Sequence, residues 1–290
     1  MMASASSFAS RHGLQSGIKG GDGAKNQVAL AYALFICLAL AVLHFVADGE
    51  FSAIMTMAVM SQSLAMLLLL LQSLTSGSAS GISARALGLE ALALCCRLSS
   101  TLWLDGYLPA DASGDWVFQA TDICTLLLVL GLLAHVLVVQ RSTYQEEEDS
   151  MPVLPIVLGS VVAAVVLHAD LNSRPLFDAL WMAGLFLGVL AVIPQFWLVS
   201  KTGGRIEALT SHFIFMMAVS RLLSGIFMWH VREDLTCDAW VGSFNHAVWA
   251  ILGAHLLHLL LLGDFVYYYV KSVATSGLAG CVEVSTIDIV

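Results

Sequence analysis

Residues 190–204 read LAVIPQFWLVSKTGG, an apolar run that contains a proline and a glutamine and ends at a lysine and two glycines. The run lies in an apolar stretch, 176–199, that is long enough to cross a bilayer. Pro194 loosens a helix, which a membrane tolerates when neighbouring groups replace the lost backbone bond. Gln195 offers a side chain that bonds across helices. We predict a transmembrane helix that leaves the membrane at Lys201.

The rest of the chain is equally apolar. Its 290 residues are 59% hydrophobic and 11% charged, whereas a soluble domain is about 45–50% apolar and about 25% charged. The composition therefore predicts a polytopic membrane protein. The net charge is -9 and the sequence has no basic stripe, so we expect no nucleic-acid partner. The cysteines have no metal-binding spacing and no nucleophile–base pair stands out, so we expect no metal, cofactor or enzymatic activity.

Eight apolar stretches are long enough to be candidate spans, and only short loops join them. They are 28–47, 51–73, 86–104, 117–140, 152–169, 176–199, 209–231 and 243–270. If the N-terminus is cytosolic, most loop lysines and arginines fall on the cytosolic side, as membrane proteins prefer. We therefore expect both termini to be cytosolic, with a disordered Ser/Gly-rich segment over 1–26.

Two arginines lie inside predicted spans, where a charge is costly and points to function. Arg97 and Arg221 each lie about 12 residues from the cytosolic end of their span, or about 18 Å deep. Two guanidinium groups at matched depth are suited to binding carboxylate or phosphate in one cavity. The alternative is structural pairing with a buried acid, for which Glu90, Asp122 and Asp264 are available.

Two further features favour structural interpretations. His255 and His258 share one face of the last span, and we interpret them as hydrogen-bonded packing residues rather than metal ligands. The acidic run 145–149 follows the end of a span, and we interpret it as a solvated loop.

Several short motifs, in conserved order and spacing from about residue 50 to 272, resemble those of the ER lumen protein-retaining receptors, the KDEL receptors. The resemblance rests on the PQ pair and the SKTG that follows it, on the two intramembrane arginines, and on four further stretches. These stretches are Ser80–Ser83 (SGIS), Arg141–Tyr144 (RSTY), Thr210–Phe213 (TSHF) and Asp264–Lys271 (DFVYYYVK).

The resemblance implies a PQ-loop fold, similar to that of the SWEET transporters, in which a linker helix joins two three-helix bundles. The linker would be 152–169. The expected organisation is a cytosolic N-terminus (1–26), an extra transmembrane helix (27–48), a seven-helix receptor-like domain (49–272) and a cytosolic tail (273–290). An extra N-terminal helix also occurs in divergent plant proteins similar to these receptors.

The resemblance also implies a function: binding the C-terminal K/HDEL-type signal of escaped luminal proteins in the Golgi and returning them to the endoplasmic reticulum. Arg97 and Arg221 would grip carboxylates of this tetrapeptide. Membrane lipid and a vesicle coat on the cytosolic side would be the other partners, although the tail after Lys271 has no lysine. Six residues are candidate site neighbours: Gln62, Asp122, Ser220, Ser224, Trp229 and Asp264.

The chain departs from the family at several binding positions. Met55 replaces a luminal arginine, Gln62 a histidine linked to pH, and Gly188 a glutamate. Ser220 and Ser224 replace tyrosines. Each lost charge-assisted contact is worth about 1.5–3 kcal/mol. Two alternatives therefore stay open, a PQ-loop carrier for a small solute and a scaffold of the early secretory membranes that binds no ligand.

Overall fold

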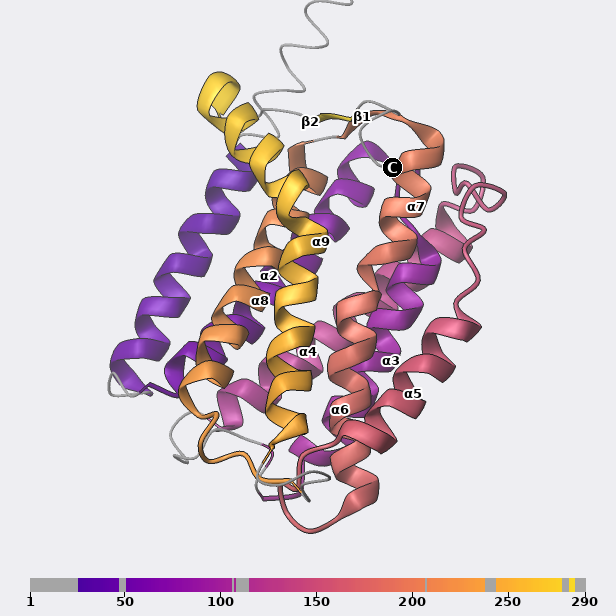
Figure 1. Cartoon of the computed structure of the whole chain (residues 1–290). Helices are drawn as coiled ribbons and strands as arrows, with labels where there is room; N and C mark the ends of the chain where they lie inside the picture. The colour runs from indigo at the N-terminus through magenta and orange to yellow at the C-terminus, as the bar shows by residue number, and fades with distance from the viewer. Residues whose placement is uncertain are drawn as a thin grey trace, which may run out of the picture.

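The computed structural model describes residues 26–46, 51–105, 107, 115–206, 208–237, 244–277 and 282–284. Helices occupy all eight predicted regions and run roughly along one axis (Figure 1). They are the N-terminal helix (Asn26–Phe45), α2 (Ala53–Ser76), α3 (Ala84–Thr101), α4 (Asp115–Ala134) with the π-helical turn η1 (His135–Val139), α5 (Leu154–Leu167), α6 (Pro175–Leu190), α7 (Val192–Thr202), α8 (Ala208–His230) and α9 (His246–Ser276). Residues 1–25, predicted to be disordered, and most of the predicted tail lie outside the described residues.

Six of these helical regions are long and apolar enough to cross a membrane: the N-terminal helix, α2, α4 with η1, α6 with α7, α8 and α9. The other two predicted spans are helical as well, but α5 has only 14 residues, and α3 carries Arg85, Glu90 and Arg97 within its 18 residues. The protein is an all-α polytopic membrane protein.

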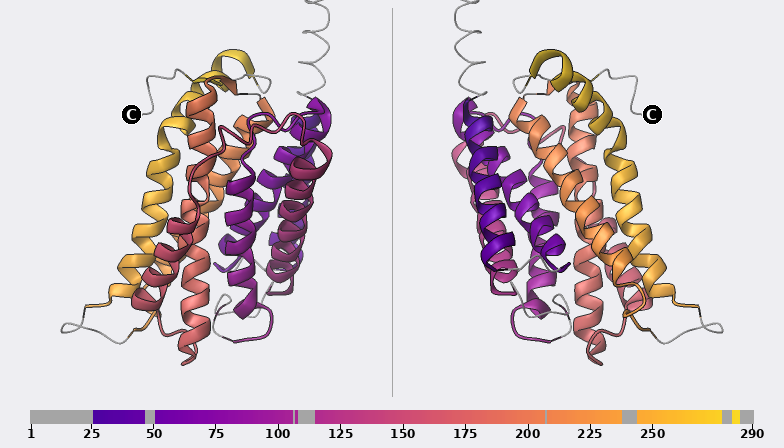
Figure 2. Two further views of the ribbon diagram at one scale, coloured as in Figure 1. Left: turned by 90° about the vertical axis from the view of Figure 1, so that its right-hand side faces the viewer. Right: turned by 90° about the vertical axis from the view of Figure 1, so that its left-hand side faces the viewer.

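Their contacts group the helices into two bundles of three. Figure 2 shows the earlier helices (purple) beside the later ones (orange to yellow) from two sides. In the first bundle, α4 packs against both α2 and α3; in the second, α9 packs against α6 and α8. The bundles meet where α2 lies against α8 and where α3 lies against α6. Helix α5 packs on α6, and the N-terminal helix lies outside both bundles (indigo in Figure 1).

The local sequence explains where several helices begin and end. Helix α2 ends at Gly77, whose φ of 61° is the left-handed conformation that glycine adopts at helix ends. Ser83 caps α3 by accepting a hydrogen bond from the backbone N–H of Ala86. Prolines occupy the first turns of α5 and α6, where a missing N–H costs nothing.

Gln195 of the opening stretch joins the two bundles, and Pro194 follows a break in its helix. The helix is interrupted at Ala191, three residues before Pro194. Gln195 is buried; its Oε1 accepts a hydrogen bond from the backbone N–H of Ser83 at 2.9 Å, and its Nε2 donates to the carbonyl of Gly81 at 2.6 Å. Because both partners belong to the turn between α2 and α3, this amide joins the second bundle to the first.

The acidic run 145–149 is solvated in its middle, as its charge predicts, since Glu146 and Glu147 are exposed, but its last residue is not. Asp149 is fully buried. Its carboxylate accepts hydrogen bonds from Ser83 Oγ and from Tyr144 Oη, both at 2.7 Å. Burial and the Asp149 carboxylate raise the pKa of Tyr144, so this phenol keeps its proton and donates at neutral pH. The loop is therefore part of the same polar clamp as Gln195.

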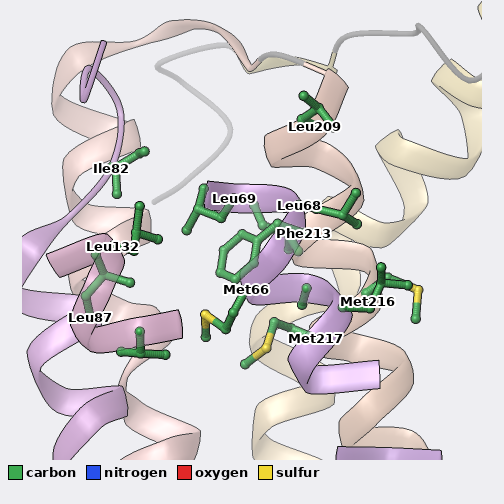
Figure 3. Close-up of a cluster of buried hydrophobic side chains, with 14 of the residues drawn as sticks. Met66, Leu68, Leu69, Ile82, Leu87, Leu132, Leu209, Phe213, Met216 and Met217 are labelled. Carbon is green, nitrogen blue, oxygen red and sulfur yellow. The ribbon is translucent and has the colours of Figure 1, made fainter. Parts of the chain in front are cut away.

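Apolar clusters fill the space between the helices toward each of their two ends. Figure 3 shows one, in which side chains of α2, α3, α4 and α8 interlock at the end near Ile82 and Leu209. Toward the other end, Trp181, Phe227 and Ile251 lie in a second cluster. A short antiparallel pairing of β1 (Gly204–Ile206) with β2 (Val282–Val284) attaches the chain's end to the loop after α7.

Candidate functional site

The two intramembrane arginines lie at the seam between the bundles, in one continuous polar network. Arg97 donates to both carboxylate oxygens of Asp122, at 2.7 and 2.6 Å, and to Gln62 Oε1 at 3.3 Å. Gln62 in turn donates through Nε2 to Glu90. Glu90 Oε1 lies 3.7 Å from Nη2 of Arg221. The order is Asp122–Arg97–Gln62–Glu90–Arg221, with two positive and two negative charges in balance.

The helices place these residues at matched depth. Arg97 and Arg221 each lie 13 residues after the first residue of their helix, or about 20 Å along it. Arg221 comes from α8, Glu90 and Arg97 from α3, Gln62 from α2 and Asp122 from α4. The ion pairs with Glu90 and Asp122 that the sequence-based alternative named are therefore present, and the two arginines stand at equal distances along their helices.

The two arginines differ in how well their guanidinium groups are paired. Arg97 makes a bidentate ion pair with Asp122, whose side chain is 1% exposed. Arg221 is 4% exposed, and its only charged partner among the described residues is Glu90, at a distance too long for a good hydrogen bond. Its Nε has no hydrogen-bond partner in the described part of the chain. Arg221 therefore retains unused capacity to bind an acceptor.

A small cavity of about 30 Å³ lies in the network, which is room for water but not for a peptide. Its lining combines both arginines with residues of α2, α3, α6, α8 and α9, among them Met55, Gln62, Glu90, Gly184, Gly188, Ser224 and His255. Trp181 and Met228, from the second apolar cluster, close one side. In this conformation the cavity is too small for a peptide, although the Arg97 side chain remains 16% exposed.

Three of the six candidate neighbours belong to the network or its cavity, and three do not. Gln62 and Ser224 line the cavity, and Asp122 pairs with Arg97. Ser220 is buried on α8 but does not line the cavity. Trp229 is 56% exposed and stacks under Arg232. Asp264 is exposed on α9. Neither Trp229 nor Asp264 lines the cavity.

Two glycines of α6 allow the close approach that forms the site. A Cβ at Gly184 would lie 2.9 Å from the carbonyl oxygen of Ala93, so α3 and α6 could not pack this closely with any larger residue. A Cβ at Gly188 would lie 3.1 Å from Nη2 of Arg221. The four-residue spacing is the small-residue pattern of tightly packed membrane helices. The sequence shows this spacing, but nothing in it indicates which helix the glycines face.

The prediction that His255 and His258 are hydrogen-bonded is wrong for the described residues. Both rings are buried, and none of their four nitrogens has a partner within the described ranges. His255 lies against Gly225 of α8 and lines the cavity. Periodicity correctly indicated that the two histidines share a face of α9, but it could not indicate that their ring nitrogens lack partners among the described residues.

A second polar contact holds the loops at the opposite end from Gln195. Tyr107 Oη lies 2.7 Å from Oδ1 of Asp178, which is 1% exposed, and 2.9 Å from Oδ1 of Asn172. Burial and the Asp178 carboxylate raise the pKa of Tyr107, so the phenol remains a donor at neutral pH. The backbone of Asp170 pairs with that of Thr236. These contacts join the loops that lie over the Trp181 cluster.

The fold and the network together define a polytopic membrane protein with buried ion pairs at the seam of two three-helix bundles. The family model of the ER lumen protein retaining receptor matches residues 78–232, more than half of the chain. The chain therefore belongs to this family.

Individual relatives agree. The ER lumen protein-retaining receptor erd-2.2 of Caenorhabditis elegans is 29% identical over 215 residues, which cover 74% of this chain and 91% of the relative. The ER lumen protein-retaining receptor 3 of Xenopus laevis is 27% identical over 216 residues, covering 73% and 90%. The receptor of Petunia hybrida is 25% identical over 216 residues, covering 73% and 91%.

Proposed function

We propose that this protein is a retrieval receptor that binds the C-terminal K/HDEL-type signal of luminal proteins in Golgi membranes and releases it in the endoplasmic reticulum. The observation that carries the proposal is Arg221, a buried guanidinium with an unpartnered Nε and a weakly placed counter-ion. The names of the relatives, which are retaining receptors of the ER lumen, support the same function.

Carboxylates of the ligand would replace the internal carboxylates that pair with the two arginines. A peptide carboxylate that enters the seam takes the open donors of Arg221 and replaces the 3.7 Å contact with Glu90. Glu90 remains hydrogen-bonded to Gln62, so it is not left unpaired. A second carboxylate of the peptide competes with Asp122 for Arg97. Arg97 exchanges less readily, because its pair with Asp122 is bidentate and short.

Binding requires an open conformation. A cavity of about 30 Å³ cannot hold a tetrapeptide, so Trp181 and Met228 must move away from the arginines. The route from the lumen lies under the loops that Tyr107 and Asp178 fasten. The structure would then be the closed state of the receptor, in which the internal ion pairs occupy the place of the ligand.

The proposed orientation puts both termini, the Gln195 clamp and β1–β2 in the cytosol, and Tyr107 in the lumen. Most loop arginines and lysines follow this assignment, and Arg174 and Arg232 are the exceptions. Residues 49–272 form the receptor domain and the N-terminal helix is an addition to it, followed at the far end by a cytosolic tail over 273–290. A vesicle coat would bind on the cytosolic side.

One observation favours a second function, a scaffold that binds no ligand. Both arginines have internal counter-ions, and the described residues leave little room around them. Such pairing would be sufficient to explain buried arginines without any ligand. The carrier alternative has no comparable support, because a cavity of about 30 Å³ holds little more than water.

A binding measurement separates these functions. Purified full-length protein is titrated with a labelled peptide ending in K/HDEL at about pH 5.5 and about pH 7.4. We expect tighter binding at the lower pH and a loss of at least about tenfold in Arg221→Ala, because a charge-assisted contact is worth about 1.5–3 kcal/mol. Arg97→Ala should weaken binding as well.

Arg232→Ala is the matched control, because Arg232 ends the same helical region but is paired with Glu233 at the surface. Arg221→Lys, which keeps the charge but loses the planar fork, covers the case that the alanine variant does not fold. The absence of binding at both pH values would contradict the receptor function for this signal and favour the scaffold.

A further inference from the structure

A second, larger cavity lies far from the charged network, between the N-terminal helix, α2 and α4. The N-terminal helix packs on the bundle near both of its ends, through Val28 and Ala31 at one end and Val42 at the other, all buried. Between these contacts, Leu34 and Leu38 are 62% and 58% exposed. The helix thus leaves an apolar groove of about 600 Å³ beneath its middle.

The groove is too narrow for another helix. Its wall on the N-terminal helix runs from Ala31 to Val46, which is about 22 Å long. Spread over this length, the volume gives the centre of a water molecule a path about 6 Å wide; adding the radius of the molecule, about 1.4 Å, on each side gives a groove about 9 Å wide, just under the width of about 10–12 Å of a helix with side chains. A single hydrocarbon chain, with carbon contacts at about 4 Å, fits this width.

The chemistry of the lining agrees with these dimensions. All three walls belong to helices that are apolar and long enough to cross a membrane, so the groove opens toward lipid. Its polar side chains are only Ser63, Thr121 and Cys124, set among apolar ones. Trp116 lies at the mouth, in the first turn of α4, and is 66% exposed. An indole N–H at this level is suited to a lipid ester carbonyl.

We propose that this groove binds one acyl chain of a membrane phospholipid, with the headgroup at the end where Trp116 lies. The chain fills the gap under the N-terminal helix and completes its packing against α2 and α4. The site does not depend on the peptide-binding function, since it shares no lining residue with the cavity around Arg97 and Arg221.

Photolabelling tests the proposal. Full-length protein is reconstituted in nanodiscs with phosphatidylcholine that carries a diazirine in the middle of one acyl chain, and adducts are mapped after irradiation. We expect them to concentrate on Ser63, Leu67 and Cys124. Ala120→Phe places a ring in the groove; if the ring displaces two methylene groups, occupancy falls about tenfold. Val162→Phe, at a 64% exposed position of α5 outside the groove, should leave labelling unchanged.

Two results would overturn the proposal. One is labelling that is spread evenly over lipid-facing positions such as Leu127 and Val162. The other is groove labelling by a photoactivatable sterol that fully displaces the acyl label. If Ala120→Phe does not fold, Ala41→Phe on the opposite wall tests the same space, and undiminished labelling there contradicts the proposal equally.

Discussion

Gly188 of α6 leaves the space that the guanidinium of Arg221 occupies: a Cβ at position 188 would lie 3.1 Å from Nη2. The resemblance to the KDEL receptors places a glutamate at this position. A glutamate there would reach Arg221 directly, whereas Glu90 is 3.7 Å away. This one position therefore controls how freely Arg221 can accept a ligand.

Gly188→Glu should weaken peptide binding at neutral pH by about tenfold or more, because the new carboxylate competes for Arg221; this is opposite in sign to the gain expected if a glutamate here contacted the peptide itself. Gly188→Ala is the control, since a methyl group only displaces a flexible side chain by a few tenths of an ångström. Peptide titration of both variants checks this. Tighter binding in the glutamate variant would show that Arg221 does not bind the ligand carboxylate.

Gln62→His should make peptide affinity more dependent on pH. Gln62 connects Arg97 with Glu90 and cannot itself titrate. An imidazole has an ordinary pKa of about 6.5, so it gains a positive charge as the pH falls and attracts the peptide carboxylates more strongly. The ratio of affinities at about pH 5.5 and 7.4 should rise relative to the wild type. An unchanged ratio would place position 62 outside the binding reaction.

Gln195→Leu should destabilise the protein by about 1–3 kcal/mol, since it leaves the buried backbone groups of Ser83 and Gly81 without partners. Gln119→Leu is the comparison, because that amide makes one hydrogen bond, to the carbonyl of Thr101. Thermal unfolding in detergent measures both. A midpoint that falls no further in Gln195→Leu than in Gln119→Leu would show that the clamp does not hold the bundles together.

Tyr107→Phe should loosen the loops over the Trp181 cluster. The variant removes the hydroxyl that bonds Asp178 at 2.7 Å but keeps the ring. Hydrogen exchange in the segment 170–178 should rise, and peptide association should become faster if these loops gate the site. Since burial raises the pKa of Tyr107, the phenol is protonated below about pH 10. The stabilisation that it provides is fully present there and is lost only as alkaline pH approaches the raised pKa.

The sequence predicted most of the fold because apolar length and charge are local properties. All eight helical regions and the buried depth of Arg97 and Arg221 follow from them. Which side chains form hydrogen bonds with one another is not a local property. Asp149 belongs to an acidic run that is predicted to be solvated. It is nevertheless buried, and it accepts a hydrogen bond from Ser83, 66 positions away. Gln62 was expected near the site, but its role as a bridge depends on how α2 meets α3, which periodicity does not determine.

The central claim is that buried arginines exchange internal carboxylates for those of a peptide. The most direct measurement compares two labelled peptides that both end in the K/HDEL sequence, one with a free C-terminal carboxylate and one amidated, on wild-type protein at about pH 5.5. We predict that amidation weakens binding by at least about tenfold, the effect of losing one charge-assisted contact. Equal affinity for the two peptides, or no binding of either, would contradict the account.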